Sequence, residues 1–325
     1  MYDKWKKAVI HLECAMDIEK ISEKIFRDYE LENKLNRDEI SLDHYREEIS
    51  KGFELKRSHG TAIFIIHDRK RYLLTARHVL FDKSESDKKF EEDQRRHEEY
   101  SAVSGFYRSP PERDTNTIFK HIFRVPSLDE NKGIDAKRLF IRYLHVGPYE
   151  SRPYTFSDYE KDLAIISLDQ RNPAFADHLI ELGYAPIPSE EIESGSLKEG
   201  DEVFTVGFPA ATCFLGQFLT DPSLMMSSSP LYSLPVFSWG RVSMLHHNLH
   251  FYWCDISIYP GNSGGPLISD GKLVGIVVAQ ASVSIDDYPS VRTRIPFAKI
   301  IKGDYIKELI DEQEKKDNFL RTGGV

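Results

Sequence analysis

The chain has 325 residues, of which 40% are hydrophobic and 29% are charged, and its formal net charge is −9. This length and composition are ordinary for a globular protein of one large or two medium domains with ample material for a hydrophobic core. The acidic balance argues against a nucleic-acid partner, because such a partner favours a basic face.

The chain contains three cysteines, Cys14, Cys213 and Cys254. Their number is odd, their spacings are wide and no Cys-x-x-Cys pair exists, so neither a disulfide framework nor a zinc site is suggested. No metal or organic cofactor is expected, since the histidines show no ligand spacing and no phosphate-cradling glycine loop leads into a helix. A reducing, cytoplasmic setting fits this cysteine usage best.

No segment reaches the roughly 18 apolar residues that a membrane-spanning helix needs. The N-terminal run "AVIHLECAM" is interrupted by His11 and Glu13, and it lacks the uninterrupted core and cleavage site of a secretory signal. We therefore expect a soluble protein with no membrane partner.

The first half of the chain alternates short apolar runs with charged segments. The apolar runs predict strands at 7–15, 60–67, 71–80, 121–125, 138–144 and 162–168. Two charged segments, 17–58 and 82–116, interrupt them. Apolar residues recur at helical spacing in the first, which predicts an amphipathic helical layer; the second is expected to be an exposed insertion, helical or mobile in its first part.

A change in composition marks a linker at 186–200. Beyond it, the runs "DEVFTVGFP", "VFSWGRVSML", "LHFYWCDISI", "PLISD" and "KLVGIVVAQ" predict strands, so that residues 201–299 favour a β barrel or sandwich. Residues 300–325 are predicted to form a terminal helix and tail, on the recurrence of Ile300, Ile301, Ile306, Leu309 and Ile310.

Ser263 lies in the run "GNSGGPL", between two predicted strands. Glycine at 261 permits backbone conformations that are costly for other residues. The main-chain N–H groups of Gly261 and Ser263 could then converge on one point, as an oxyanion hole requires. The strands on both sides distinguish this loop from the strand-to-helix turn of the α/β-hydrolases.

A serine nucleophile needs a base and a carboxylate that orients the base. His78 in "TARHV", at the end of the predicted strand 71–80, is the candidate base. Asp162 leads the apolar strand "DLAIISL" and is the candidate carboxylate, whereas its nearest competitor, Asp158, lies in a polar loop.

Together, "TARHV", "DLAII" and "GNSGGPL" resemble the trypsin-like serine proteases of the chymotrypsin fold, in the family's order of His, Asp and Ser. The resemblance is closest to the bacterial intracellular branch that includes the high-temperature-requirement proteases, although no PDZ module is recognised. It implies a mainly β fold of two six-stranded antiparallel β-barrels. Residues 1–185 would form the first barrel, with the insertions at 17–58 and 82–116, and residues 201–299 the second.

Three departures from the family pattern carry information. Secreted, zymogen-activated members have Asp at the position of Asn262, so activation by N-terminal cleavage is not expected. Arg77 stands where a small residue is usual beside the base, which could perturb local packing. The segments 17–58 and 82–116 lie outside the catalytic pattern, and we expect them to dock a regulatory protein partner.

The resemblance places Ser257 at the base of the primary specificity pocket and Val278, Ala279 and Gln280 along its wall. No acid stands at the base, so an uncharged residue is expected before the scissile bond, unless Asp286 or Asp287 reaches in from the next loop. The predicted function is a serine endopeptidase acting on proteins or peptides through Ser263, His78 and Asp162. The alternatives are a latent or catalytically silent binding module and, less favoured by the chain order of the motifs, a lipase or esterase.

Overall fold

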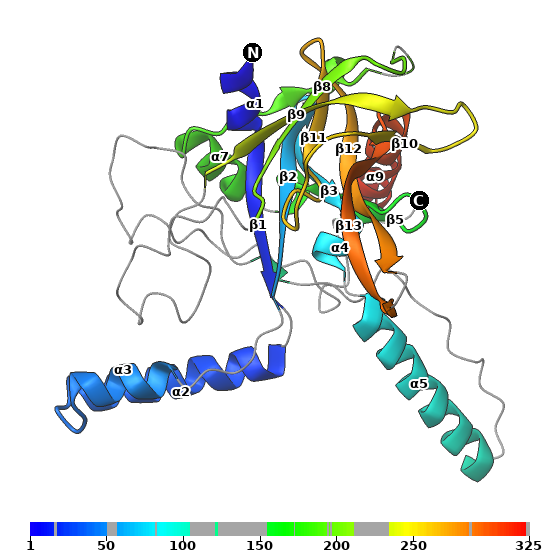
Figure 1. Ribbon diagram of the computed structural model, residues 1–325. Helices are drawn as coiled ribbons and strands as arrows, with labels where there is room; N and C mark the ends of the chain where they lie inside the picture. The colour runs from blue at the N-terminus through cyan, green and yellow to red at the C-terminus, as the bar shows by residue number, and fades with distance from the viewer. Residues whose placement is uncertain are drawn as a thin grey trace.

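The computed structural model describes residues 1–15, 18–50, 57–81, 83–104, 121–122, 155–171, 173–193, 195, 197–210, 234–285 and 288–322. Within these ranges the chain is built mainly from two antiparallel β-structures, each with helices at its margins (Figure 1). The predicted strand at 138–144 lies outside the described residues.

The N-terminal β-structure is a sheet of seven strands in the order β4-β1-β2-β3-β6-β5, with β7 paired to β2. Its strands are β1 Val9–Ala15, β2 Arg57–His67, β3 Lys70–Ala76, β4 His121–Ile122, β5 Thr155–Asp158, β6 Leu163–Ser167 and β7 Ile187–Pro188. The strands at its centre are buried on both faces, as in the consecutive run 62–65 of β2. This burial explains why the sequence shows continuous apolar runs there instead of alternation.

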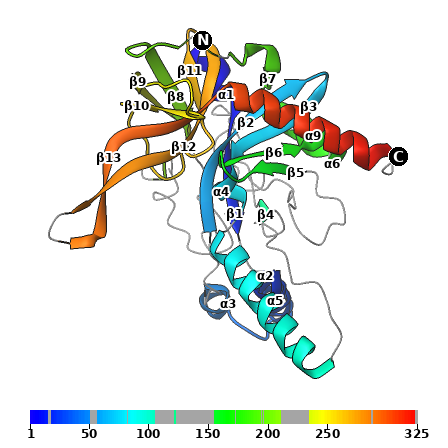
Figure 2. The same cartoon turned by 90° about the vertical axis from the view of Figure 1, so that its right-hand side faces the viewer.

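The C-terminal β-structure is a closed barrel in the order β10-β13-β12-β11-β8-β9. Its strands are β8 Glu202–Gly207, β9 Val236–Met244, β10 Phe251–Cys254, β11 Pro266–Ser269, β12 Lys272–Ile285 and β13 Tyr288–Lys302. The long strands β12 and β13 pair along a hairpin that projects beyond the barrel (Figures 1 and 2). The predicted mainly β fold with a six-stranded second barrel is confirmed, while the described part of the first unit forms a seven-stranded sheet in place of the expected closed barrel.

Helices occupy the margins of both β-structures. Those described are α1 Tyr2–Ala8, α2 Ile18–Asn36, α3 Leu42–Ser50, α4 Arg77–Leu80, α5 Lys83–Ser104, α6 Leu168–Arg171, α7 Pro173–Glu181 and α9 Asp304–Thr322. The helical N-terminal insertion was predicted and appears as α2 and α3, while α1, α6 and α7 were not predicted. Among the helices described, none combines the length and the apolar character needed to cross a bilayer.

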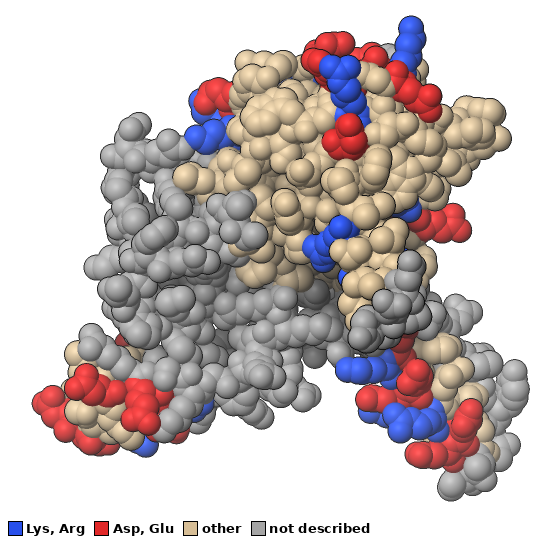
Figure 3. Space-filling model, viewed as in Figure 1, with Lys and Arg blue, Asp and Glu red and all other residues tan. Residues whose placement is uncertain are grey.

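The helices α2, α3 and α5 extend from the same end of the molecule, away from the sheets (Figures 1 and 2). Their visible surface carries many acidic and basic side chains, whereas the β-structure above them presents mainly uncharged surface (Figure 3). The described side chains of α5 are exposed or half-buried. This helix therefore contributes no described side chain to the hydrophobic core.

The terminal helix begins later than the sequence suggested. Ile300 and Ile301 belong to β13, where they pair with β10 on one side and with β12 on the other. Pairing on both edges outweighs the helical spacing of these β-branched residues, so the helix starts at Asp304. Helix α9 then packs on β5 and β6 of the first sheet, and its Glu314 also bonds Lys70 and Tyr72 of β3.

The helix α1 joins the start of the chain to the C-terminal barrel. The Tyr2 ring packs edge-on against Phe204 and Phe237, with ring centroids 5.1 and 5.6 Å away. Trp5 is fully buried in the core cluster that contains residues of both β-structures. The first residues of the chain therefore pack against a barrel that begins about 200 residues later.

The predicted linker also holds the two β-structures together. Its strand β7 runs parallel to β2, pairing Ile187 with Ile65. Ile192 forms a bridge to Leu273 of β12, and Glu191 pairs with Lys4 of α1. The segment is therefore fixed to both units along its described length.

Candidate active site

His78 lies in α4, immediately after β3, and not at the end of the strand as the sequence suggested. The strand ends at Ala76, and the Arg77 N–H still donates to the main-chain oxygen of Asp162 at 2.8 Å, one position beyond the last pair of β3 and β6. The following residues turn into a single helical turn, which Phe81 closes by donating to the Arg77 carbonyl. His78 is thereby turned out of the sheet, with 49% of its side chain exposed.

Asp162 holds His78 by two further contacts. One carboxylate oxygen, Oδ2, lies 2.6 Å from His78 Nδ1, and the other accepts the His78 main-chain N–H at 2.9 Å. Asp162 has a φ of 56°, a left-handed conformation that aspartate tolerates better than most residues. The competing candidate, Asp158, instead bonds the ammonium group of Lys161 at 2.6 Å.

Arg77 is accommodated by burial. Its side chain is 5% exposed, its Nε donates to the Ser157 hydroxyl at 3.2 Å, and its guanidinium lies over the rings of Phe81 and Tyr159. Stacking on aromatic faces suits the planar, weakly hydrated guanidinium group. The large side chain beside His78 therefore packs beneath α4 and not in the cleft.

The loop that carries Ser263 depends on two glycines with positive φ. Gly261 has a φ of 104°, and a Cβ there would lie 2.1 Å from the Phe208 carbonyl oxygen. Gly264 has a φ of 86°, and a Cβ there would lie 2.0 Å from the Thr61 carbonyl oxygen. A larger residue at either position would combine backbone strain with a clash against main-chain atoms.

Asn262 stabilises the same loop from within. It is 2% exposed, its side-chain oxygen accepts the Tyr259 N–H at 3.0 Å, and its own N–H donates to the Tyr259 carbonyl. The loop is also tied to β2, since the Thr61 N–H donates to the Ser263 carbonyl at 2.8 Å. Within the part of the chain that the structure describes, the N–H groups of Gly261 and Ser263 donate to no acceptor.

His78 and Ser263 line the same open cleft, with a volume of about 460 Å³. Gly261 and the segment 278–280 also line it, so most of the predicted site residues meet there. The exposed Ser257 is not among the lining residues, and its role as pocket base stays a prediction. The Ser263 hydroxyl is 3.5 Å from the Val278 carbonyl oxygen, and among the described atoms no hydrogen bond joins it to His78.

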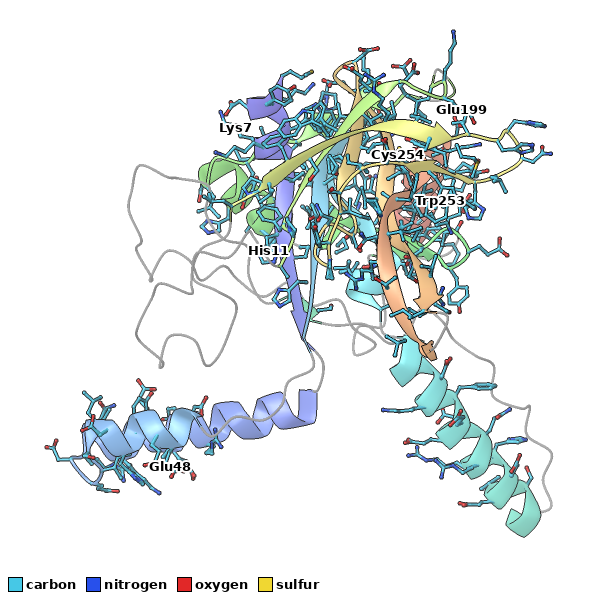
Figure 4. The ribbon with its side chains drawn as sticks, in the orientation of Figure 1. Lys7, His11, Glu48, Glu199, Trp253 and Cys254 are labelled. Atoms are coloured by element: carbon cyan, nitrogen blue, oxygen red, sulfur yellow. The ribbon has the colours of Figure 1, made fainter. Side chains whose placement is uncertain are left out.

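Residues that the sequence analysis had not assigned also line the cleft, notably His59 and Arg294. His59 stacks on His11 of β1 (labelled in Figure 4), which in turn stacks on Phe208. Complete burial, followed by repulsion from His59, lowers the pKa of His11 from 6.5 to about 3. His11 is therefore neutral and supports the wall behind the cleft.

Cys254 is unsuited to act as a nucleophile, and the described residues form no metal-binding cluster. Burial in the barrel raises the pKa of the Cys254 thiol far above its ordinary range, which removes its nucleophilic thiolate form. Cys254 lies within the barrel in Figure 4. Among the residues with described positions, no three His, Cys, Asp or Glu side chains gather closely enough to hold a metal ion.

The closed barrel, the second sheet and the cleft between them have the architecture of the trypsin-like serine proteases, the chymotrypsin fold. Residues 60–276 match the family described as trypsin-like peptidase domain, and the chain belongs to that family. It is also similar to a protein named serine protease DegP homolog from Plasmodium falciparum (isolate 3D7), with 29% identity over 152 residues. The match covers 46% of this chain but only 14% of that protein.

Proposed function

We propose that this protein is a serine endopeptidase that hydrolyses peptide bonds through an acyl-enzyme intermediate. Ser263 is the nucleophile, His78 is the general base and Asp162 is the carboxylate that orients the base. The observation that carries the proposal is the 2.6 Å contact between His78 Nδ1 and Asp162 Oδ2, beside a cleft that Ser263 also lines.

In the proposed tautomer, His78 Nδ1 carries the proton and donates a hydrogen bond to Asp162 Oδ2, 2.6 Å away. Nε2 is then unprotonated and able to act as a base. As Ser263 Oγ attacks the substrate carbonyl carbon, its proton passes to Nε2. The C–N bond then breaks, the same proton goes to the leaving amine, and Ser263 holds the acyl group as an ester. A water molecule then attacks this ester with His78 again acting as the base. The acyl group leaves as a carboxylic acid, and the proton returns from His78 to the Ser263 hydroxyl.

The main-chain N–H groups of Gly261 and Ser263 stabilise the negative oxygen that develops during attack. Their lack of an acceptor among the described residues supports this role, since an occupied donor could not turn to the substrate. Ser257 and the segment Val278, Ala279 and Gln280 are proposed to contact the substrate, and the last three line the cleft.

A second candidate is a latent protease or a catalytically silent binding module. It is favoured by one observation, the direction of the Ser263 hydroxyl towards the Val278 carbonyl instead of His78 Nε2. Rotation of a serine side chain is fast, and catalytic hydrogen bonds are often long without substrate. We therefore keep the active enzyme as the proposed function.

A fluorophosphonate probe on the purified full chain separates these candidates. We expect the wild type to be labelled and Ser263→Ala to be unlabelled. The matched control is Ser58→Ala, since Ser58 lines the same cleft but donates to the Val79 carbonyl at 3.0 Å. Labelling that survives in Ser263→Ala, or that is absent from the wild type, contradicts the proposal.

We further propose that the charged helices α2, α3 and α5 dock a regulatory protein partner. Their described surface extends away from both β-structures and contributes little to the core. Deleting residues 84–100 should leave the melting temperature unchanged and alter either activity or partner binding. Unchanged activity together with unchanged binding rejects this role.

A cytoplasmic location is proposed from the cysteine usage. Cys254 is buried as a free thiol, and a reducing compartment keeps such thiols reduced. Fractionation of cells that express the full chain tests this, because recovery in a membrane or secreted fraction contradicts it.

A further inference from the structure

The cleft beside Ser263 has an unusual charge. Among its described lining residues, Arg294 is the one side chain with a permanent charge, and none of them is an aspartate or glutamate. The carboxylate of the proposed triad, Asp162, does not line the cleft and is engaged by His78. A substrate side chain that enters this cleft therefore meets a positive charge and no competing acid from the described lining.

The backbone directs Arg294 towards the cleft through an irregularity in the β12–β13 hairpin. Gln280 of β12 pairs with Ala298 of β13, whereas Ser282 pairs with Arg294. Two steps along β12 thus correspond to four along β13, so β13 carries a bulge between these positions. Bulges re-aim side chains and are common beside active sites. Gln280 and Arg294 consequently line the same cleft from neighbouring strands.

Arg294 is exposed, and among the described residues no acid or carbonyl bonds its guanidinium. The cross-strand neighbour of Arg294, Ser282, is neutral. Arg292, two residues earlier and on the same face of β13, differs from Arg294 in its hydrogen bonding and in its position relative to the cleft. Its guanidinium donates to the Ser282 carbonyl at 3.1 Å, and it does not line the cleft.

We propose that the cleft selects substrates with a carboxylate side chain, Asp or Glu, at the residue before the scissile bond, and that Arg294 is the residue that selects it. A guanidinium binds a carboxylate through two parallel hydrogen bonds, which gives both attraction and fixed geometry. This inference rests on the proposed peptidase function. It replaces the expectation of an uncharged residue before the scissile bond. That expectation considered Ser257 at the base of the pocket and did not consider Arg294 on β13.

The test is a positional peptide library, followed by matched peptides that differ only in Glu or Gln before the cleaved bond. For the wild type we expect kcat/KM to favour Glu by at least about tenfold. Arg294→Gln should reduce this preference to about twofold, and Arg294→Glu should reverse it in favour of Lys. Arg292→Gln, the matched control, should retain it. A wild-type profile dominated by uncharged or basic residues overturns the proposal, as does an equal loss in Arg292→Gln.

Two measurements separate failure of this inference from failure of the peptidase function. Fluorophosphonate labelling of Ser263 should persist in Arg294→Gln, which shows that the nucleophile is intact. Ser263→Ala, titrated with the fluorescent Glu and Gln peptides, should bind the Glu peptide more tightly, and salt should weaken that difference. Equal binding of the two peptides overturns the proposal whether or not the wild type cleaves.

Discussion

The hydroxyl of Thr61, on β2 of the first sheet, donates a hydrogen bond of 2.7 Å to the carbonyl of Gly261, in the loop of the barrel that carries the serine. The same oxygen accepts the Phe208 N–H at 3.0 Å, so one buried hydroxyl joins the sheet to two segments of the barrel. Thr61 is fully buried, and no solvent can replace these bonds. The orientation of the peptide bond after Gly261 therefore depends on a residue of the other β-structure.

Thr61→Val keeps the shape of this side chain and removes its hydroxyl. We expect a loss of about 2 kcal/mol in the free energy of unfolding, because a buried carbonyl and a buried N–H lose their partner. We also expect a lower kcat with little change in KM, since the loop that positions Ser263 is loosened. Urea denaturation and steady-state kinetics measure the two effects.

Thr205→Val is the control for Thr61→Val, because its hydroxyl is equally buried and donates to the Pro266 carbonyl at 2.7 Å. It should lose somewhat less stability, because only one buried carbonyl loses its partner, and it should retain more of its kcat. An equal fall in kcat for both variants assigns the effect to general loosening of the barrel and contradicts a positioning role for Thr61.

Asp162→Asn should reduce kcat/KM by roughly a thousandfold or more, since an amide facing His78 Nδ1 favours the wrong tautomer of the imidazole. The fold should persist, because asparagine also tolerates the left-handed φ at this position. The control is Asp158→Asn, which removes the negative charge of the ion pair with Lys161 and leaves His78 untouched. If the two variants lose activity to the same extent, Asp162 has no special part in the reaction.

Gly264→Ala should destabilise the protein by about 3 kcal/mol or more, since a left-handed φ of 86° is combined with a Cβ 2.0 Å from a carbonyl oxygen. Gly183→Ala is the matched comparison, because its φ of 95° is also positive but nothing lies within 4 Å of its Cβ. Thermal unfolding of both variants isolates the contribution of the clash. If both variants lose the same stability, the positive φ alone explains the loss and the clash contributes nothing.

The buried His11 predicts a loss of stability in mild acid. The unfolded chain takes up a proton on His11 below a pH of about 6.5, while the folded protein resists protonation until about pH 3. Between these values the unfolded state binds more protons than the folded state. The free energy of unfolding therefore decreases as the pH is lowered, and at pH 5 it is about 2 kcal/mol below its value at neutral pH. In His11→Phe, this part of the decrease in stability between pH 7 and pH 5 should be absent.

Urea denaturation at pH 7 and pH 5 measures the difference between the wild type and His11→Phe. His44→Phe, at an exposed position of α3, is the control and should keep the pH dependence of the wild type. If His11→Phe loses as much stability as the wild type between these pH values, His11 titrates normally in the folded protein.

The sequence predicted the mainly β fold and the segments that carry His78, Asp162 and Ser263, because each depends on a local pattern. Apolar runs locate the strands, and short motifs locate the three polar residues. The helical turn at His78 was not predicted, since it depends on a hydrogen bond to Asp162, 84 residues away. The roles of Thr61 and Arg294 likewise depend on packing between distant segments, and Thr61 contacts a residue 200 positions later.

The strand at 300–301 and the helix α1 were also not predicted, because both depend on contacts between distant segments. The helical spacing of Ile300 and Ile301 competes with two neighbouring strands that no local pattern reveals. The helix α1 has only seven residues, too few for a helix to be stable by itself, and Trp5 is buried by partners far along the chain.

The packing of α1 on the barrel has a consequence for the order of folding during synthesis. Tyr2 and Trp5 leave the ribosome about 200 residues ahead of the aromatic side chains of β8 and β9 that contact Tyr2. At roughly 5–20 residues per second, this delay leaves the nascent α1 segment without these partners for about 10–40 seconds. Such long-range closure slows folding, and a chaperone that holds apolar N-terminal segments should raise the yield of native protein.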